Sequence, residues 1–121
     1  MQILLAVFIG GGLGSVIRYI LSRSITSNFT TINPIGTFTA NLISTILLGV
    51  VLYISASRFE ISGTAKALII VGFCGGFSTF STFSYETFEL IRTGSYTFAI
   101  ANIVVSLLLG VGVLFLLARN I

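Results

Sequence analysis

Charged side chains are scarce in this sequence. Only 7% of its 121 residues are charged, whereas an ordinary soluble domain carries about 25%. Hydrophobic residues make up 55% of the chain, and the mean hydropathy is +1.12. A chain of this composition cannot cover its surface with polar groups, so we expect it to be a multi-pass protein of a lipid bilayer.

Histidine and cysteine, which build many catalytic and metal sites, are almost missing. The sequence has no histidine, and Cys74 is its single cysteine. These absences exclude His-dependent catalysis, the common zinc sites and an intramolecular disulfide. The six cationic residues form no basic cluster, so we expect no nucleic-acid partner. We therefore predict that the protein is not an enzyme.

The few charges separate four apolar segments. A spanning helix needs about 20 mostly apolar residues. The predicted spans lie at about 3–21, 35–54, 67–92 and 97–118, joined by short polar links at 22–31, 55–64 and 93–96. We expect one all-α transmembrane domain over residues 1–121, with Asn33-Pro34 leading into the second span.

The cations are divided evenly between the two sides of such a domain. Arg58, Lys66 and Arg119 fall on the side of the termini, and Arg18, Arg23 and Arg92 fall on the other. The positive-inside rule therefore predicts no orientation. Two interpretations stay open: chance in a small protein, or dual topology, in which copies insert both ways and pair antiparallel.

The first span carries small residues at helical spacing. Gly10, Gly14 and Arg18 follow one another at four-residue intervals, with Gly11 and Ser15 beside them. Small residues let helices approach closely in lipid, so this pattern predicts a packing seam. The long side chain of Arg18 is expected to reach the membrane interface.

The third span departs from an ordinary helix. Residues 72–84 contain three glycines and five hydroxyl residues at membrane depth. The Gly75-Gly76 pair favours a break near the middle, which lipid tolerates only inside protein or beside water. We expect Ser78 or Thr79 to cap the second half. Carbonyls freed at the break suit a cation such as Na⁺; the alternative is a glycine-lined kink used for packing.

Two aromatic residues follow this break. Phe80 and Phe83 lie three apart, so they share one side of a helix. The edge of a phenyl ring is positive and can meet an anion, and Ser81 and Thr82 add hydroxyl donors. The alternative is that both rings simply face lipid or the core.

Polar side chains also line the second and fourth spans. Thr37, Asn41 and Ser44 or Thr45 form one stripe, and Asn102 and Ser106 form a pair. Such residues either join helices or line a pathway.

No charged residue lies at the centre of a predicted span, so passive permeation is favoured over proton-coupled transport. Glu86, Glu89 and Arg92, spaced by three, are expected to form an ion-pair ladder at a helix end.

These motifs together resemble a known family. The run from Gly10 to Tyr19, the Gly36-Thr37 pair followed by Asn41, and the long segment 72–86 are similar to the Fluc/CrcB fluoride channels. The resemblance covers the whole chain, and the third-span motif is its most specific part.

The resemblance implies a plasma-membrane channel that passively exports F⁻, built as an antiparallel homodimer with two pores. It implies a structural Na⁺ held by the backbone carbonyls of Gly75 and Ser78, and Arg18 near an aqueous vestibule. The fluoride-pore residues it implies are Phe80, Phe83, Asn41, Ser81, Thr82, Ser106 and Thr37.

Two other classes remain open. A dual-topology exporter of the small multidrug type shares the size and span number, but it needs a membrane-embedded glutamate in the first span, which this sequence lacks there. A non-transporting subunit of a larger complex would conduct no ions by itself.

Overall fold

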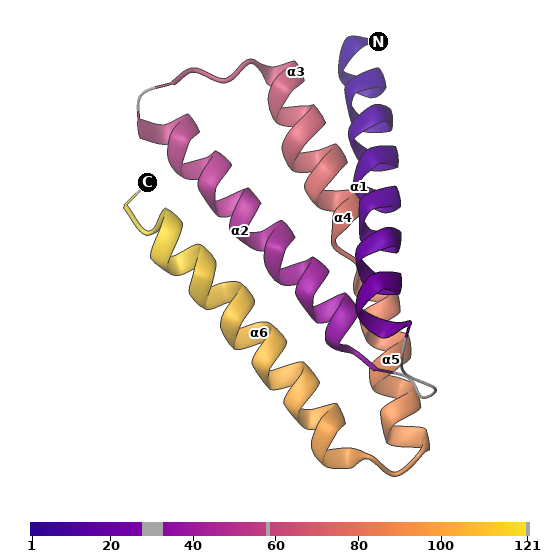
Figure 1. The fold of residues 1–121 in the computed structure, drawn as a ribbon. Coiled ribbons are helices and arrows are strands. Elements are labelled where there is room, and N and C mark those ends of the chain that lie inside the picture. The colour runs from indigo at the N-terminus through magenta and orange to yellow at the C-terminus, as the bar shows by residue number, and fades with distance from the viewer. Residues whose placement is uncertain (28–32, 58, 121) are drawn as a thin grey trace.

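Helices are the regular secondary structure in the parts that the computed structural model describes, which are residues 1–27, 33–57 and 59–120. Within them, four helical stretches are long and apolar enough to cross a membrane. Three are continuous: α1 (Gln2–Thr26), α2 (Ile35–Ser57) and α6 (Tyr96–Ala118). The third span is interrupted, and it comprises α3 (Gly63–Lys66), η1 (Ala67–Cys74), α4 (Gly75–Phe77) and α5 (Phe80–Arg92). The prediction of an all-α chain with four candidate spans, the third one bent, is confirmed (Figure 1).

The helices run further into the predicted links than the apolar pattern suggested. α1 continues to Thr26, and its hydroxyl residues bond back to the preceding turn: the hydroxyl of Ser24 donates to the Ile20 carbonyl at 2.8 Å, and that of Thr26 to the Ser22 carbonyl at 2.6 Å. Residues 28–31 of the first predicted link lie outside the described residues, as does Arg58, one of the cations counted above.

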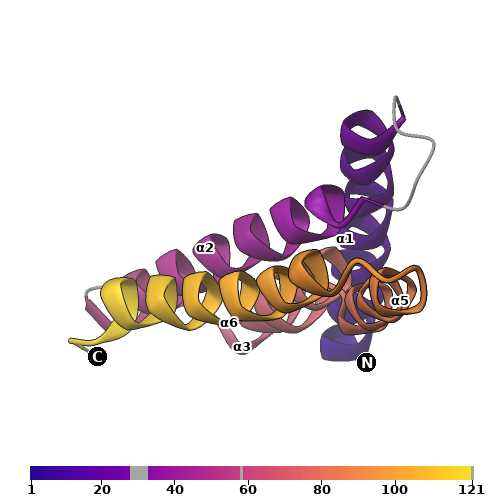
Figure 2. The same ribbon diagram turned by 90° about the horizontal axis from the view of Figure 1, so that it is seen from below.

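The helices pack in two pairs that meet at the interrupted span. α1 packs along η1 and α4, α6 packs along α2, and α2 contacts η1, α4 and α5. Seen from below, α2 and α6 run side by side while α1 is steeply inclined to them (Figure 2). α1 also contacts α2, so both α2 and the interrupted span touch every other span.

The contact between α1 and the interrupted span is made by backbone rather than side chains. A Cβ added at Gly10 would collide with the Leu68 carbonyl, and one added at Gly76 would collide with the Gly11 carbonyl. Glycines on both helices thus bring the two backbones together, as a small-residue seam does in membranes. The predicted packing role of the first-span glycines agrees with this geometry.

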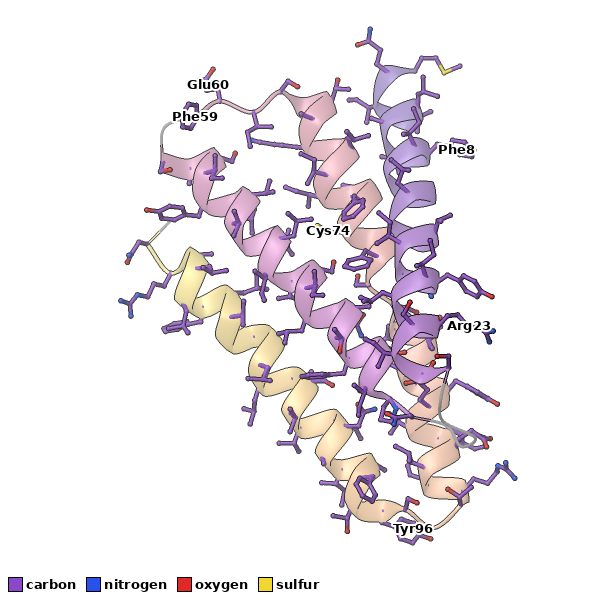
Figure 3. The ribbon with its side chains drawn as sticks, viewed as in Figure 1. Phe8, Arg23, Phe59, Glu60, Cys74 and Tyr96 are labelled. Carbon is purple, nitrogen blue, oxygen red and sulfur yellow. The ribbon has the colours of Figure 1, made fainter. Side chains whose placement is uncertain are left out.

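Large apolar side chains cover the outside of the molecule. Phe8 is 78% exposed on α1, and it projects away from the other helices (Figure 3). The buried positions are instead mostly small, with Ala40 and Ala99 almost fully covered. Apolar side chains outside and small residues inside are the arrangement expected in lipid, where close packing replaces the hydrophobic drive between helices.

A tight turn joins α5 to α6. The N–H of Ser95 donates to the Leu90 carbonyl at 2.8 Å, and that of Gly94 donates to the Ile91 carbonyl at 3.1 Å. This pair of bonds closes the end of α5, and it requires the left-handed backbone that Gly94 adopts at a φ of 82°.

Candidate functional site

The break in the third span lies at two extended residues. Ser78 has a ψ of 156°, and Thr79 has φ and ψ of −150° and 125°, whereas Gly75 is helical. The expectation that the Gly75-Gly76 pair makes the break is therefore wrong in position. Gly76 is needed as a glycine because it packs against the backbone of α1, and the chain leaves the helix two residues later.

Thr79 begins the second half of the span. Its hydroxyl oxygen accepts from the N–H of Thr82 at 3.3 Å, which makes it the N-cap of α5. Ser78 instead donates its hydroxyl back to the Cys74 carbonyl at 2.8 Å. Of the two capping residues considered from the sequence, Thr79 is the one that caps.

Asn41 on α2 occupies the gap between the two half-helices. Its side-chain oxygen accepts from the N–H of Thr79 at 2.7 Å, and its amide nitrogen donates to the Thr79 carbonyl at 3.2 Å. These bonds satisfy two backbone groups that a break would otherwise leave without partners in the membrane. One N–H of the amide remains for another acceptor.

The rest of the polar stripe on α2 also faces the interrupted span. The buried Ser44 donates to the Cys74 carbonyl at 2.9 Å, and the buried Thr37 donates to the Glu86 carboxylate at 2.7 Å. Thr45 bonds within its own helix, to the Asn41 carbonyl. The stripe therefore joins α2 to η1 and α5, one of the two roles considered for it.

Glu86 does not belong to the predicted ion-pair ladder. Arg92 pairs with Glu89 through bonds of 2.6 and 2.9 Å, but Glu86 lies on the side of α5 that faces Thr37. Its second carboxylate oxygen is buried, with no hydrogen-bond partner among the described residues. The ladder predicted from the three-residue spacing does not include Glu86, because residues 86 and 92 are six apart and lie on different sides of the helix.

Arg18 reaches the break from α1. Its Nε donates to the Gly76 carbonyl at 3.2 Å, and the Ser15 hydroxyl lies 3.5 Å from the same oxygen. The side chain is half-buried. Instead of extending only toward the membrane interface, the guanidinium therefore contacts the end of the first half-helix.

Three carbonyls at the break remain free. Those of Cys74, Gly76 and Thr79 accept the bonds described above. No hydrogen bond within the described chain reaches the carbonyls of Gly75, Phe77 or Ser78. The described residues also hold no cluster of three or more acidic, histidine or cysteine side chains, so a cation bound here would have to use backbone oxygens.

The predicted phenylalanines form a pair at the head of α5. The ring centroids of Phe80 and Phe83 are 5.9 Å apart, with the planes inclined by 35°, and Phe80 is 79% exposed. The hydroxyls of Ser81 and Thr82 lie 3.2 and 3.3 Å from that of Thr79. Rings and hydroxyls thus gather at a helix N-terminus, whose dipole favours an anion.

Ser106 lies apart from this group, across a small cavity. A space of about 30 Å³, large enough for a water molecule, is lined by Phe38, Asn41, Leu42, Thr45, Ser106 and Gly110. Asn41 is the residue that connects this cavity to the break. The neighbouring Asn102 instead donates to the Thr87 hydroxyl at 2.9 Å in a buried contact, and so joins α6 to α5.

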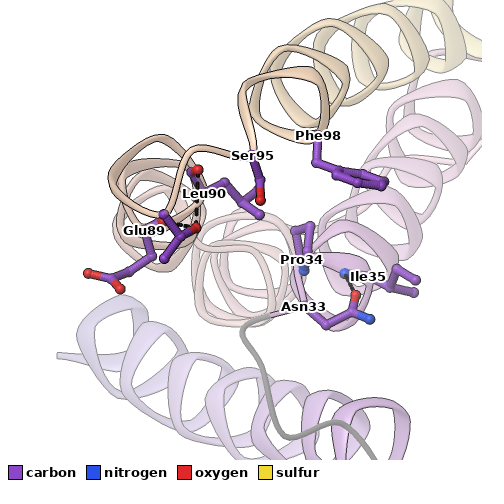
Figure 4. A pocket seen from close by; sticks show the side chains of 8 residues that line it. Asn33, Pro34, Ile35, Glu89, Leu90, Ser95 and Phe98 are labelled. Atoms are coloured by element: carbon purple, nitrogen blue, oxygen red, sulfur yellow. Dashed lines mark hydrogen bonds between the residues drawn. The ribbon is translucent and has the colours of Figure 1, made fainter.

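A larger cavity lies away from the predicted site residues. It measures about 620 Å³ and is formed where α2 begins, α5 ends and α6 begins. Figure 4 shows Pro34, Leu90 and Phe98 around it. None of the residues expected to contact fluoride or Na⁺ lines this space.

Two features were not predicted from the sequence. Residues 67–74 form a wide π-helix rather than an α-helix, a rare geometry that often occurs at functional sites, and no residue pattern signals it. The Thr87 partner of Asn102 was also missed, although a hydroxyl in the middle of α5 is a visible signal.

Known proteins resemble this chain over most of its length. Residues 5–118 match the family model described as CrcB-like protein, Camphor Resistance (CrcB). A protein of Phocaeicola vulgatus is 44% identical over 111 residues, covering 92% of this chain and 91% of that protein. One of Escherichia coli K12 is 45% identical over 108 residues, covering 89% and 84%. One of Pyrococcus horikoshii is 42% identical over 117 residues, covering 95% and 92%. All three relatives carry the name fluoride-specific ion channel FluC.

Proposed function

The chain belongs to the CrcB-like protein family, and we propose that it is a fluoride-selective channel. Fluoride passes near the start of α5, where Phe80, Phe83, Ser81 and Thr82 gather. The observation that carries the proposal is this grouping of ring edges and hydroxyls at a helix N-terminus, together with the name shared by relatives at 42–45% identity.

The electrostatics of the grouping favour a small anion. The edges of aromatic rings and the N-terminal end of α5 both carry partial positive charge. Neither requires a full cationic side chain, which would bind the anion tightly and hinder its release. Asn41, with one amide N–H still unused, Thr37, and Ser106 across the small cavity extend this polar path along α2 and α6.

A second copy of the chain completes the pathway in this proposal. Phe80 lies on the outside of the described helices, 79% exposed, so a pore wall opposite it has to come from another molecule. An antiparallel homodimer with dual topology supplies that wall twice, which produces two pores. The even division of cations in the sequence is compatible with insertion in both orientations.

A structural Na⁺ lies between the two breaks of such a dimer. The carbonyls of Gly75 and Ser78 are free of hydrogen bonds within the described chain, which supports them as ligands. Hard cations prefer oxygen ligands of this kind. The Phe77 carbonyl is equally free and is a further candidate.

Transport through this channel is passive and directed outward across the plasma membrane. HF is a weak acid that crosses membranes uncharged and releases F⁻ in a more alkaline cytoplasm. The inside-negative potential then drives the anion out, since moving one charge is worth about 2.3 kcal/mol per 100 mV. No chemical step is required, so the protein acts as a channel rather than as an enzyme.

Anion efflux from liposomes tests the proposal. Purified protein is reconstituted at low density, and F⁻ and Cl⁻ release are recorded in parallel with ion-selective electrodes. We expect rapid loss of F⁻ with negligible loss of Cl⁻, and no stimulation by a proton gradient. Release of neither anion from folded protein would favour the exporter or subunit alternatives, and equal release of both would contradict selectivity.

A further inference from the structure

We propose that Arg18 is a positioning residue that holds the break of the third span in shape. The proposal rests on the function proposed above, because the break places Phe80 at the head of α5. It begins from one contact: Nε of Arg18 donates to the carbonyl of Gly76 at 3.2 Å, two residues before the chain becomes extended.

The carbonyls at the end of a helix need partners. In the bilayer no bulk water supplies them, so each unsatisfied carbonyl is costly. A cation beside the last turn also compensates the negative end of the helix dipole. Arg18 supplies both a donor and a positive charge to the half-helix that ends at Phe77.

The close backbone contact between α1 and the interrupted span explains why an arginine on α1 can perform this role. A Cβ at Gly14 would collide with the Phe73 carbonyl, so α1 lies against the interrupted span one turn before Arg18. Ser15 approaches the same Gly76 carbonyl at 3.5 Å. The guanidinium therefore does not have to extend far to reach the Gly76 carbonyl.

Arg18 is the charged member of a set of side chains that hold the break. Asn41 bonds both backbone groups of Thr79, and Ser44 bonds the Cys74 carbonyl, both from α2. Arg18 acts from α1, the other helix that packs against η1 and α4. Without it, Gly76 keeps only the longer contact with Ser15, and the first half-helix can unwind at its end.

The native cysteine reports directly on this opening. Cys74 is the sole cysteine of the chain, only 4% exposed, and it lies between α1 and α2 in the middle of the molecule (Figure 3). Its labelling by N-ethylmaleimide in reconstituted protein, followed by mass spectrometry, measures how often the end of the half-helix opens.

The variant Arg18→Gln removes the charge. We expect it to raise the Cys74 labelling rate about tenfold to hundredfold, the factor that a hydrogen bond to a charged group contributes to an opening equilibrium. Arg18→Lys keeps a charged donor and should fall between Gln and the native protein. Arg23→Gln is the matched control, because Arg23 is exposed on the same helix and points away from the break (Figure 3).

The outcomes separate positioning from simple attraction of anions. Equal labelling in Arg18→Gln, Arg23→Gln and the native protein would overturn the proposal. Fluoride efflux should fall in Arg18→Gln at low and high ionic strength alike, since salt screens only the attraction; a defect that disappears with salt would also overturn the proposal.

If Arg18→Gln does not fold, Ser15→Ala, which removes the other donor, should raise labelling of Cys74 more weakly. Unchanged labelling in Ser15→Ala would count against the proposal.

The labelling result does not depend on fluoride. Faster labelling in Arg18→Gln, combined with no fluoride flux from the native protein, would keep the role of Arg18 at the break and overturn the proposed function. Fluoride flux from the native protein, combined with unchanged labelling in Arg18→Gln, would support the proposed function and overturn the role of Arg18.

Discussion

Asn41 and Thr79 are joined by two hydrogen bonds that cross the break of the third span. The Thr79 N–H donates to the Asn41 side-chain oxygen at 2.7 Å, and the Asn41 amide nitrogen donates to the Thr79 carbonyl at 3.2 Å. A single side chain on α2 thus satisfies both backbone groups of an extended residue inside the membrane. The interruption is therefore part of the stable fold, and α2 supplies the hydrogen bonds that it needs.

Replacement of Asn41 should destabilise the protein. Asn41→Ala leaves the N–H and carbonyl of Thr79 without partners, which costs about 1–3 kcal/mol for each buried group left unsatisfied. The measurement is the free energy of unfolding of the purified protein in a mixed-micelle titration with SDS. Thr39→Ala is the control, because the Thr39 hydroxyl bonds only within its own helix, to the Ile35 carbonyl. Equal stability of the two variants would contradict the role assigned to Asn41.

Two glycines of α1 should differ sharply in their tolerance of alanine. A Cβ at Gly10 meets the Leu68 carbonyl and the Phe73 nitrogen, whereas a Cβ at Gly12 meets nothing within 4 Å. Gly10→Ala should therefore cost about 1–3 kcal/mol or more through overpacking. Gly12→Ala should be neutral or stabilising by up to about 1 kcal/mol, since alanine favours helix. Thermal unfolding of the two variants measures the difference. A similar loss of stability at both positions would contradict the close backbone contact between α1 and the interrupted span.

The two ring residues at the head of α5 should be needed for flux but not for folding. Phe80→Ile or Phe83→Ile removes the ring edge and keeps an apolar side chain. Loss of one such interaction, worth about 1 kcal/mol, should slow fluoride efflux about fivefold or more. Phe88→Ile is the control, because Phe88 is also exposed on α5, at 56%, and lies away from the break. Normal flux in both ring variants would remove these residues from the mechanism.

Dual topology predicts that the C-terminus is found on both sides of the membrane. A single cysteine placed after a C-terminal linker in a Cys74→Ser background can be labelled with a membrane-impermeant maleimide in intact and in lysed cells. We expect partial labelling in intact cells and complete labelling after lysis, because the even distribution of cations prefers neither orientation. Complete labelling or complete protection in intact cells would rule out the mixed orientation.

The sequence alone determined the class of this protein and its four candidate spans. Few charges and long apolar runs leave no other environment than lipid, and lipid accepts only a few architectures because every backbone group must be bonded internally. For that reason four spans could be located from the charges, and the glycine pair in the third span predicted an interruption, although not its position. The apolar pattern did not predict the end of α1, which runs on to Thr26 through polar residues whose hydroxyls bond to the preceding turn.

Only the tertiary structure decided where the break lies and which groups hold it. Gly75 and Gly76 have a low intrinsic helix preference, yet both remain helical, and Gly76 packs closely against the α1 backbone at Gly11. The break falls at Ser78 and Thr79, where Asn41 supplies the partners that helical bonds no longer provide. Likewise Arg18 and Glu86 bond to elements 58 and 49 residues away in the chain. Local spacing cannot reveal such contacts, since they depend on which helices the fold brings together.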